Sequence, residues 1–124
     1  DRETLVEGNF IDVTKPNQNC GPGLRFGHSV SEELRAVNFI ARGNSINNLD
    51  GIDLAPDDYF DPFGIRVDAS RTDYNYGTGI IENNIILNCS GGIQVSDLPG
   101  QNIEIRSNRI NSSDFGVNIW SVPE

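Results

Sequence analysis

The sequence predicts an all-β solenoid in which the chain winds through about four stacked coils. Three observations support this fold class: a repeat of about 24 residues, apolar residues at alternate positions within the repeat, and a composition rich in isoleucine and asparagine. The chain has 15 Asn and 14 Ile, but only one Lys and no Met. β-Branched side chains favour strands and short amides favour turns, so helix is disfavoured along most of the chain.

The repeat has the pattern I-x-x-N-x-I, then a turn, then G-φ-x-φ, where φ is an apolar residue. The third and fourth copies lie 24 residues apart, and two earlier copies follow the same pattern. In chain order the coils contain Val6, Asn9, Ile11, Gly23, Leu24 and Phe26; Ala41, Asn44, Ile46, Gly51, Ile52 and Leu54; Ile81, Asn84, Ile86, Gly92, Ile93 and Val95; Ile105, Asn108, Ile110, Gly116, Val117 and Ile119. Apolar residues two positions apart share one face of a strand, so each coil has an inward apolar face.

Two segments compete for the last strand of the second coil, because residues 51–54 and residues 64–67 both fit G-φ-x-φ. The short spacing from Ile46 favours residues 51–54. On this interpretation the chain is a single domain, residues 1–124, with an inserted loop at about residues 55–78. On the alternative, residues 47–63 are the insertion.

Stacking of the coils supplies the hydrophobic core, because one coil cannot bury its own apolar face. Neighbouring coils then pair as parallel strands. Leucine-rich repeats have a similar period, but they need a Leu-rich consensus with a helical segment in each repeat. No Leu recurs at an equivalent position here, so this class is rejected.

The run GTGIIENNIILNCSGGIQV, followed by QNIEIRSNRINSSDFGVNI, resembles the repeats of the right-handed parallel β-helix superfamily. This superfamily is pectate-lyase-like and includes pectate lyases, polygalacturonases, alginate epimerases and phage tailspikes. The resemblance covers most of the chain and is weak before residue 37. It implies that one asparagine from each coil stacks in an internal ladder. These residues are Asn9, Asn44, Asn84 and Asn108.

Candidate site residues come from positions that interrupt the repeat, since functional groups often lie on excursions from a rigid scaffold. The segment from Asp53 to Tyr76 is rich in carboxylates, guanidinium groups and aromatic rings, which together suit sugar recognition. Candidate catalytic residues are Arg66, Arg71 and Asp53; candidate substrate-binding residues are Arg25, Tyr59, Phe63, Tyr74, Tyr76 and Gln94; candidate Ca²⁺ ligands are Asp57, Asp58 and Asp61. Clustered Asp oxygens suit Ca²⁺, and an Arg suits a uronate carboxylate.

The outward residue of each G-φ-x-φ strand defines a second candidate feature. Parallel register stacks Arg25, Asp53, Gln94 and Asn118 in one column on the solvent face. A mixed polar column of this kind suits a carbohydrate groove, and it also suits an ordinary solvated sheet face.

Charge and hydropathy argue against two classes of function, nucleic-acid binding and a helical membrane span. A net charge of -9 argues against nucleic-acid binding, which needs a basic face. No apolar run reaches the roughly 20 residues of a membrane span. We expect a secreted or cell-surface location.

Cys20 and Cys89 lie on the first and third coils, about two strand spacings apart. This distance exceeds the usual reach of a disulfide, so the sequence predicts free thiols.

The ends of the stack predict association, because an uncovered coil exposes apolar core and unpaired strand edges. We expect a homo-oligomer or part of a larger chain, and symmetric contact through one end is favoured.

Three functions stay open. The first is an enzyme, a polysaccharide lyase, epimerase or glycoside hydrolase, acting on acidic polysaccharide with Ca²⁺ as the only expected cofactor. The second is a noncatalytic polysaccharide-binding module, and the third is a structural or assembly β-helix of the tailspike kind. Fold alone does not choose among them.

Overall fold

The structure is a computed structural model that describes residues 3–13, 22–27, 38–48, 63–68, 78–97 and 102–121. Among these residues there are ten β-strands and no helix, and every strand pair is parallel. The described residues therefore contain no helix that is long and apolar enough to cross a membrane. The all-β class predicted from the repeat is confirmed.

One sheet contains four strands in the order β1-β4-β7-β9, so each strand pairs with the strand one repeat later. Its strands are β1 (Glu3–Glu7), β4 (Asn38–Arg42), β7 (Thr78–Glu82) and β9 (Asn102–Arg106). Burial alternates along the two inner strands of this sheet, as the period-2 pattern of apolar residues requires.

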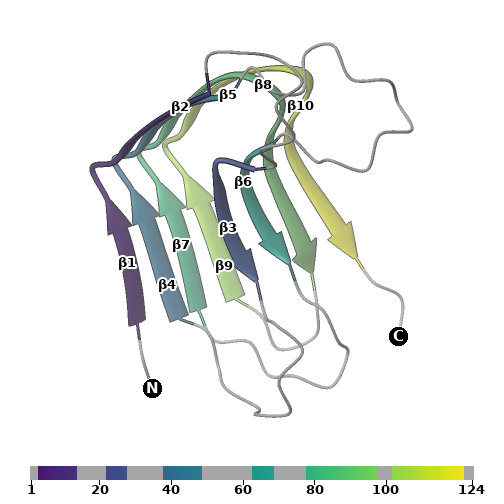
Figure 1. The fold of residues 1–124 in the computed structure, drawn as a ribbon. Helices are drawn as coiled ribbons and strands as arrows, with labels where there is room; N and C mark the ends of the chain where they lie inside the picture. Colours follow the sequence, from purple (N-terminus) through teal and green to yellow (C-terminus); the bar gives the residue numbers. More distant parts are fainter. Residues whose placement is uncertain are drawn as a thin grey trace.

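The second sheet has the order β2-β5-β8-β6-β3, and β10 pairs with β8. Its strands are β2 (Phe10–Val13), β3 (Leu24–Gly27), β5 (Ser45–Asn48), β6 (Phe63–Asp68), β8 (Ile85–Asp97) and β10 (Arg109–Ser121). In Figure 1 the described strands form an inverted U. The first sheet is the left limb, and the second sheet crosses the top and descends on the right.

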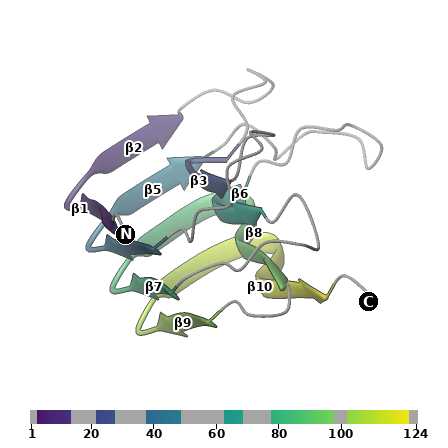
Figure 2. The ribbon, with the colours of Figure 1, turned by 90° about the horizontal axis from the view of Figure 1, so that it is seen from below.

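The described strands fall into four repeats: β1 to β3, β4 to β6, β7 with β8, and β9 with β10. Figure 2 shows these repeats as successive layers, with the first repeat at one end and the fourth at the other. The core lies between the limbs and is built by the inward apolar residue of each strand. Its fully buried members include Ile46, Ile65, Ile81, Ile86 and Ile93.

The last strand of the second repeat is β6, which corrects the assignment of residues 51–54 to this place. Ile65 pairs with Leu24 of β3 on one side and with Ile93 of β8 on the other. A strand thus lies inside the range 55–78 that was predicted as an inserted loop, whereas residues 51–54 lie outside the described residues.

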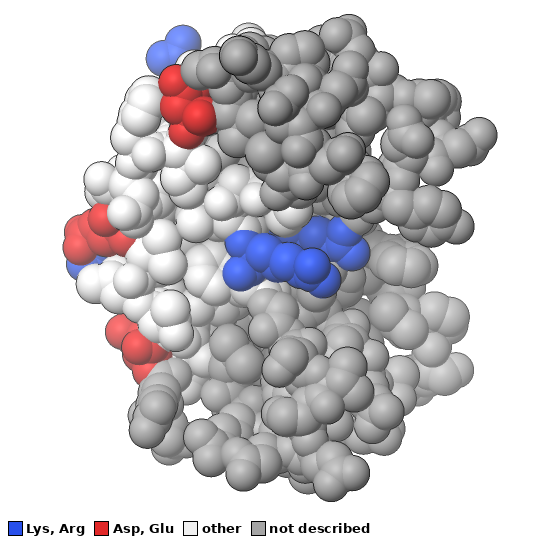
Figure 3. Space-filling view, in the orientation of Figure 1, with Lys and Arg blue, Asp and Glu red and all other residues white. Residues whose placement is uncertain are grey.

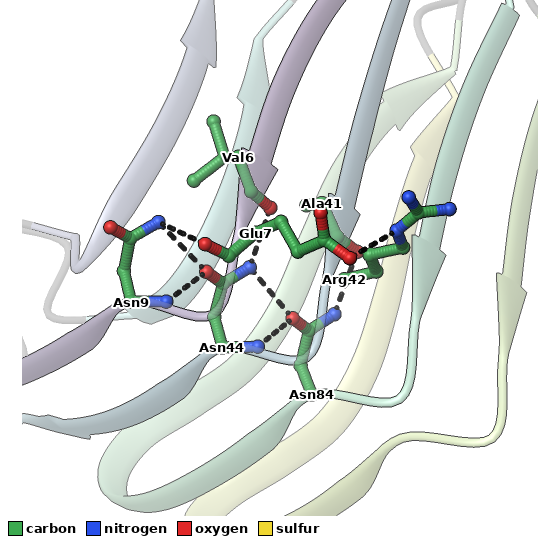
Figure 4. Close-up of polar contacts among 7 residues, drawn as sticks. All are labelled: Val6, Glu7, Asn9, Ala41, Arg42, Asn44 and Asn84. Atoms are coloured by element: carbon green, nitrogen blue, oxygen red, sulfur yellow. Dashed lines mark hydrogen bonds and ion pairs between the residues drawn. The ribbon is translucent and has the colours of Figure 1, made fainter.

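The predicted asparagine ladder is present, and Figure 4 shows its first three members. The backbone N–H and side-chain Nδ2 of Asn9 both donate to Oδ1 of Asn44, and the same pair of bonds joins Asn44 to Asn84 and Asn84 to Asn108. The Asn44 Nδ2 also donates to the Val6 carbonyl oxygen of the preceding repeat. Asn44 and Asn84 are each only 1% exposed, so their polar groups are satisfied inside the core.

The residue before each ladder asparagine adopts a left-handed backbone conformation. These residues are Gly8, Gly43, Asn83 and Ser107, with φ between 55° and 67°. Gly and Asn accept this conformation at little cost. This turn places each asparagine side chain so that it bonds to the asparagine of the next repeat.

Candidate functional site

The outward residues of β3, β6, β8 and β10 form one column across the sheet. The pairing register places Arg25 beside Arg66, Arg66 beside Gln94, and Gln94 beside Asn118. We call these four residues the Arg-amide column. In each strand the flanking apolar residues point inward, so the residue between them points outward. The column contains Arg66 and not Asp53, which was predicted in this place and lies outside the described residues.

Two arginines therefore stand side by side in an acidic protein. Adjacent strands lie about 4.8 Å apart, so the two side chains start from neighbouring positions. Arg25 is exposed and Arg66 is partly exposed. Figure 3 shows a contiguous basic patch in the middle of the face that carries β3 and β6.

Both arginines also have other contacts within the protein. Each guanidinium carries five N–H donors in a fixed fork, so an existing partner does not exhaust its donors. Carboxylates are among the groups that such guanidinium donors bind.

Gln94 adds an acceptor to the column. Its side chain is partly buried, and the buried Oε1 atom accepts no hydrogen bond from the described part of the protein. Buried polar atoms without a partner are uncommon in folded proteins. Because this oxygen is buried, a ligand hydroxyl could donate to it only after the Gln94 side chain rotates outward. Asn118, the next member of the column, is exposed and offers both a donor and an acceptor.

Phe63 is the one predicted sugar-stacking residue that the structure describes. Its side chain is 9% exposed, and its ring packs at a tilted angle against Phe115 with 5.2 Å between the ring centroids. The Phe63 ring thus belongs to the core and not to the outward face. The sequence carried a signal of this, because Phe115 also directly precedes the glycine of its repeat.

The other predicted site residues lie outside the described residues. These are the candidate catalytic residues Asp53 and Arg71, the aromatic residues Tyr59, Tyr74 and Tyr76, and the calcium ligands Asp57, Asp58 and Asp61. In the part of the chain that the structure describes, no three His, Cys, Asp or Glu residues are grouped as a metal site would require. The Arg-amide column is the candidate site that the described strands assemble.

A second charged column, on the other limb, was missed from the sequence. Glu7, Arg42, Glu82 and Arg106 are neighbours in the register of β1, β4, β7 and β9, so their charges alternate along the stack. Arg42 Nε donates to Glu7 Oε1 at 2.9 Å, and Arg106 Nε donates to Glu82 Oε2 at 2.8 Å. These residues follow the apolar residue that precedes each turn, and aligning the repeats would have shown the alternation E, R, E, R.

Glu82 and Glu104 both act on Arg106. The hydrogen bond with Glu82 and the charges of Glu82 and Glu104 raise the pKa of Arg106 above its already high value. Arg106 is therefore a permanent cation in the last described repeat.

Cys89 is a free thiol, as predicted, and Cys20 lies outside the described residues. The Cys89 side chain is 1% exposed, and its Sγ lies 3.3 Å from the Leu87 carbonyl oxygen. Burial raises the pKa of Cys89 to about 11, against a smaller opposite effect of the hydrogen bond with the Asn48 backbone. The thiol is therefore protonated at neutral pH and unsuited to nucleophilic chemistry.

Comparisons with protein-family models, with curated proteins and with solved structures find no match for this chain. The geometry of the described residues is therefore the basis for assigning a function.

Proposed function

We propose that this chain is a short right-handed parallel β-helix of the pectate-lyase-like kind, and that it binds acidic polysaccharide on the Arg-amide column. Parallel register across four repeats and the buried asparagine ladder support the β-helix. A secreted or cell-surface location fits this function.

The observation that carries the proposal is the pairing of Arg25 with Arg66. Two adjacent guanidinium groups on a chain of net charge -9 form a local site for a carboxylate, which each can bind through two parallel hydrogen bonds. The neighbouring amides of Gln94 and Asn118 continue the column with groups that suit sugar hydroxyls. A uronate polymer supplies carboxylates and hydroxyls together.

Binding without turnover is the function that this column supports best, because it contains recognition groups and no carboxylate or neutral base. Polysaccharide cleavage or epimerisation, with Asp53, Arg66 and Arg71 as catalytic residues, is the alternative. Incubation with polygalacturonate and alginate distinguishes the two. Binding should leave polymer length and sugar configuration unchanged, whereas a lyase would produce an unsaturated product that absorbs in the ultraviolet.

The binding test compares wild type with the double variant R25Q/R66Q by calorimetric titration with polygalacturonate. We expect the double variant to lose about ten-fold or more in affinity, because two charge-assisted contacts are removed. The control is R109Q, which removes an exposed arginine of β10 from outside the column and should change affinity by less than about two-fold. Equal affinity of wild type and R25Q/R66Q would exclude the column as the binding site.

Calcium is tested in the same titration. Asp57, Asp58 and Asp61 are the proposed ligands, and a Ca²⁺ bridge would join these carboxylates to an acidic polymer. If that bridge is used, EGTA should weaken binding, and millimolar Ca²⁺ should raise the melting temperature, since a ligand of the folded state stabilises it. Binding that is unchanged by EGTA would leave the Arg-amide column as the proposed site.

A further inference from the structure

The fourth repeat leaves apolar surface uncovered. Val117 and Ile119 are 45% and 61% exposed, whereas their register partners on β8, Ile93 and Val95, are 0% and 3% exposed. The space around Gly92 and Gly116 shows the same difference between the third and fourth repeats. A side chain added at Gly92 would collide with the carbonyl of the glycine that follows it one repeat later, but one added at Gly116 meets no described atom within 4 Å. Among the described residues, the face of the stack beyond β10 has room for another repeat.

The asparagine ladder has a direction, and its two ends are complementary. In each step the backbone N–H and Nδ2 of one asparagine donate to Oδ1 of the asparagine in the next repeat. Asn9 begins the series, and its Oδ1 accepts no hydrogen bond from the described residues. Asn108 ends the series, and its backbone N–H has no acceptor among them. The first repeat therefore presents an acceptor and the fourth repeat presents a donor.

Asn9 differs from the other ladder residues in a second bond. The Nδ2 groups of Asn44, Asn84 and Asn108 each donate to a backbone carbonyl of the preceding repeat. Asn9 has no preceding repeat among the described residues, and its Nδ2 makes a longer bond of 3.3 Å to the carbonyl of Glu7 in its own repeat. A repeat placed before β1 would provide the missing carbonyl.

The charges at the two ends are also opposite. The alternating column begins with Glu7 on β1 and ends with Arg106 on β9. Placing β9 of one molecule beside β1 of another would continue the alternation. A symmetric contact through one end would instead bring together two ends that carry the same charge. The polarity of the stack thus favours contact between unlike ends over the symmetric contact predicted from the sequence.

We propose that two copies of this chain associate head to tail, with the fourth repeat of one copy pairing with the first repeat of a second copy. In this register Asn108 donates to Oδ1 of Asn9 in the second copy, and Arg106 lies beside its Glu7. Ile11 of the second copy covers Ile110, as Ile110 covers Ile86 within the chain. A head-to-tail interface does not close on itself, so further copies add in the same way.

The test is sedimentation velocity of the whole chain over a range of concentrations. Wild type should show a series of increasing masses and not a single dimer. We expect E7R and R106E each to weaken association by about ten-fold or more, because an attractive pair becomes a repulsive one. Circular dichroism checks that each variant is folded, and both substitutions are at exposed charged positions.

An equimolar mixture of E7R and R106E is the decisive sample. The arginine introduced in the first variant then faces the glutamate introduced in the second, and the native Glu7 and Arg106 face each other at the next contact. Association should therefore return to the wild-type level. A monomeric wild type would overturn the proposal, and so would a mixture that fails to restore association. A symmetric contact through one end would leave one of the two single variants unaffected, which would also contradict the head-to-tail arrangement.

Discussion

Asn84 has a central place in the asparagine ladder. Its Oδ1 accepts from the backbone N–H and Nδ2 of Asn44, and its Nδ2 donates to Ala41 and Asn108, each at 3.0 Å. It is 1% exposed, so no solvent replaces these bonds when the side chain is removed. The ladder is therefore expected to make a large contribution to the stability of the fold.

Asn84→Ala should lower the free energy of unfolding by about 3 kcal/mol, because it leaves two donors of Asn44 buried without an acceptor. Urea denaturation measures the change. Asn9→Ala is the matched control at the exposed end of the ladder and should cost about 1 kcal/mol or less. Similar losses for the two variants would show that burial of the ladder is not what makes it stabilising.

The thiol of Cys89 predicts how stability depends on alkaline pH. Its pKa is 9.0 in the unfolded chain and about 11 in the folded protein, because burial disfavours the thiolate. Between these values the unfolded chain loses the proton that the folded protein retains. The stabilising contribution is therefore complete below about pH 9 and is lost as the pH rises toward about 11.

Over that interval wild type should lose about 2 to 3 kcal/mol of unfolding free energy in excess of Cys89→Ala, as expected for a shift of two pKa units. Denaturant titrations of both proteins at several pH values measure the difference, and the variant cancels the contributions of other titrating groups. Parallel pH profiles for wild type and Cys89→Ala would contradict the assignment.

At the scale of elements, glycine packing sets the spacing between repeats. Gly23, Gly64 and Gly92 each lie against the carbonyl of the glycine one repeat later and against an isoleucine side chain. The strands approach closely here because no Cβ intervenes. Gly116 occupies the equivalent place in the fourth repeat but has no such neighbour among the described strands.

Gly92→Ala should lower the free energy of unfolding by about 2 kcal/mol or more, since the added methyl group overpacks the core. Gly116→Ala should change it by less than about 0.5 kcal/mol in dilute solution, because its methyl group meets no described atom. Thermal melts at low protein concentration compare them. A destabilisation of equal size would show that the fourth repeat is covered.

Much of the strand pairing was predictable because the period aligns residues of the same type in successive repeats. The second repeat is the exception, since residues 51–54 and 64–67 fit the same local pattern and local spacing favoured the wrong one. The correct strand is identified by neighbours far away in the sequence, such as Ile86 against Gly64 and Phe115 against Phe63.

For the whole molecule, period and composition predicted a stack of parallel strands with buried asparagines. The candidate site was only partly predictable, because one misplaced strand replaced Arg66 with Asp53 in the outward column. This single change converts a mixed polar column into a basic one. The opposite charges of the two ends were also present in the sequence, as Glu7 and Arg106. Only the strand register shows that these two residues stand at opposite ends of one column.

Binding of acidic polysaccharide where Arg25 and Arg66 stand side by side is tested most directly by NMR. The isotopically labelled chain is titrated with an oligogalacturonide while backbone amides, arginine Nε–H groups and side-chain amides are recorded. We predict that the largest shifts occur at the Nε–H of Arg25 and Arg66 and at the side-chain amide of Gln94. Shifts confined to other parts of the chain, or no shifts at saturating ligand, would contradict binding at the Arg-amide column.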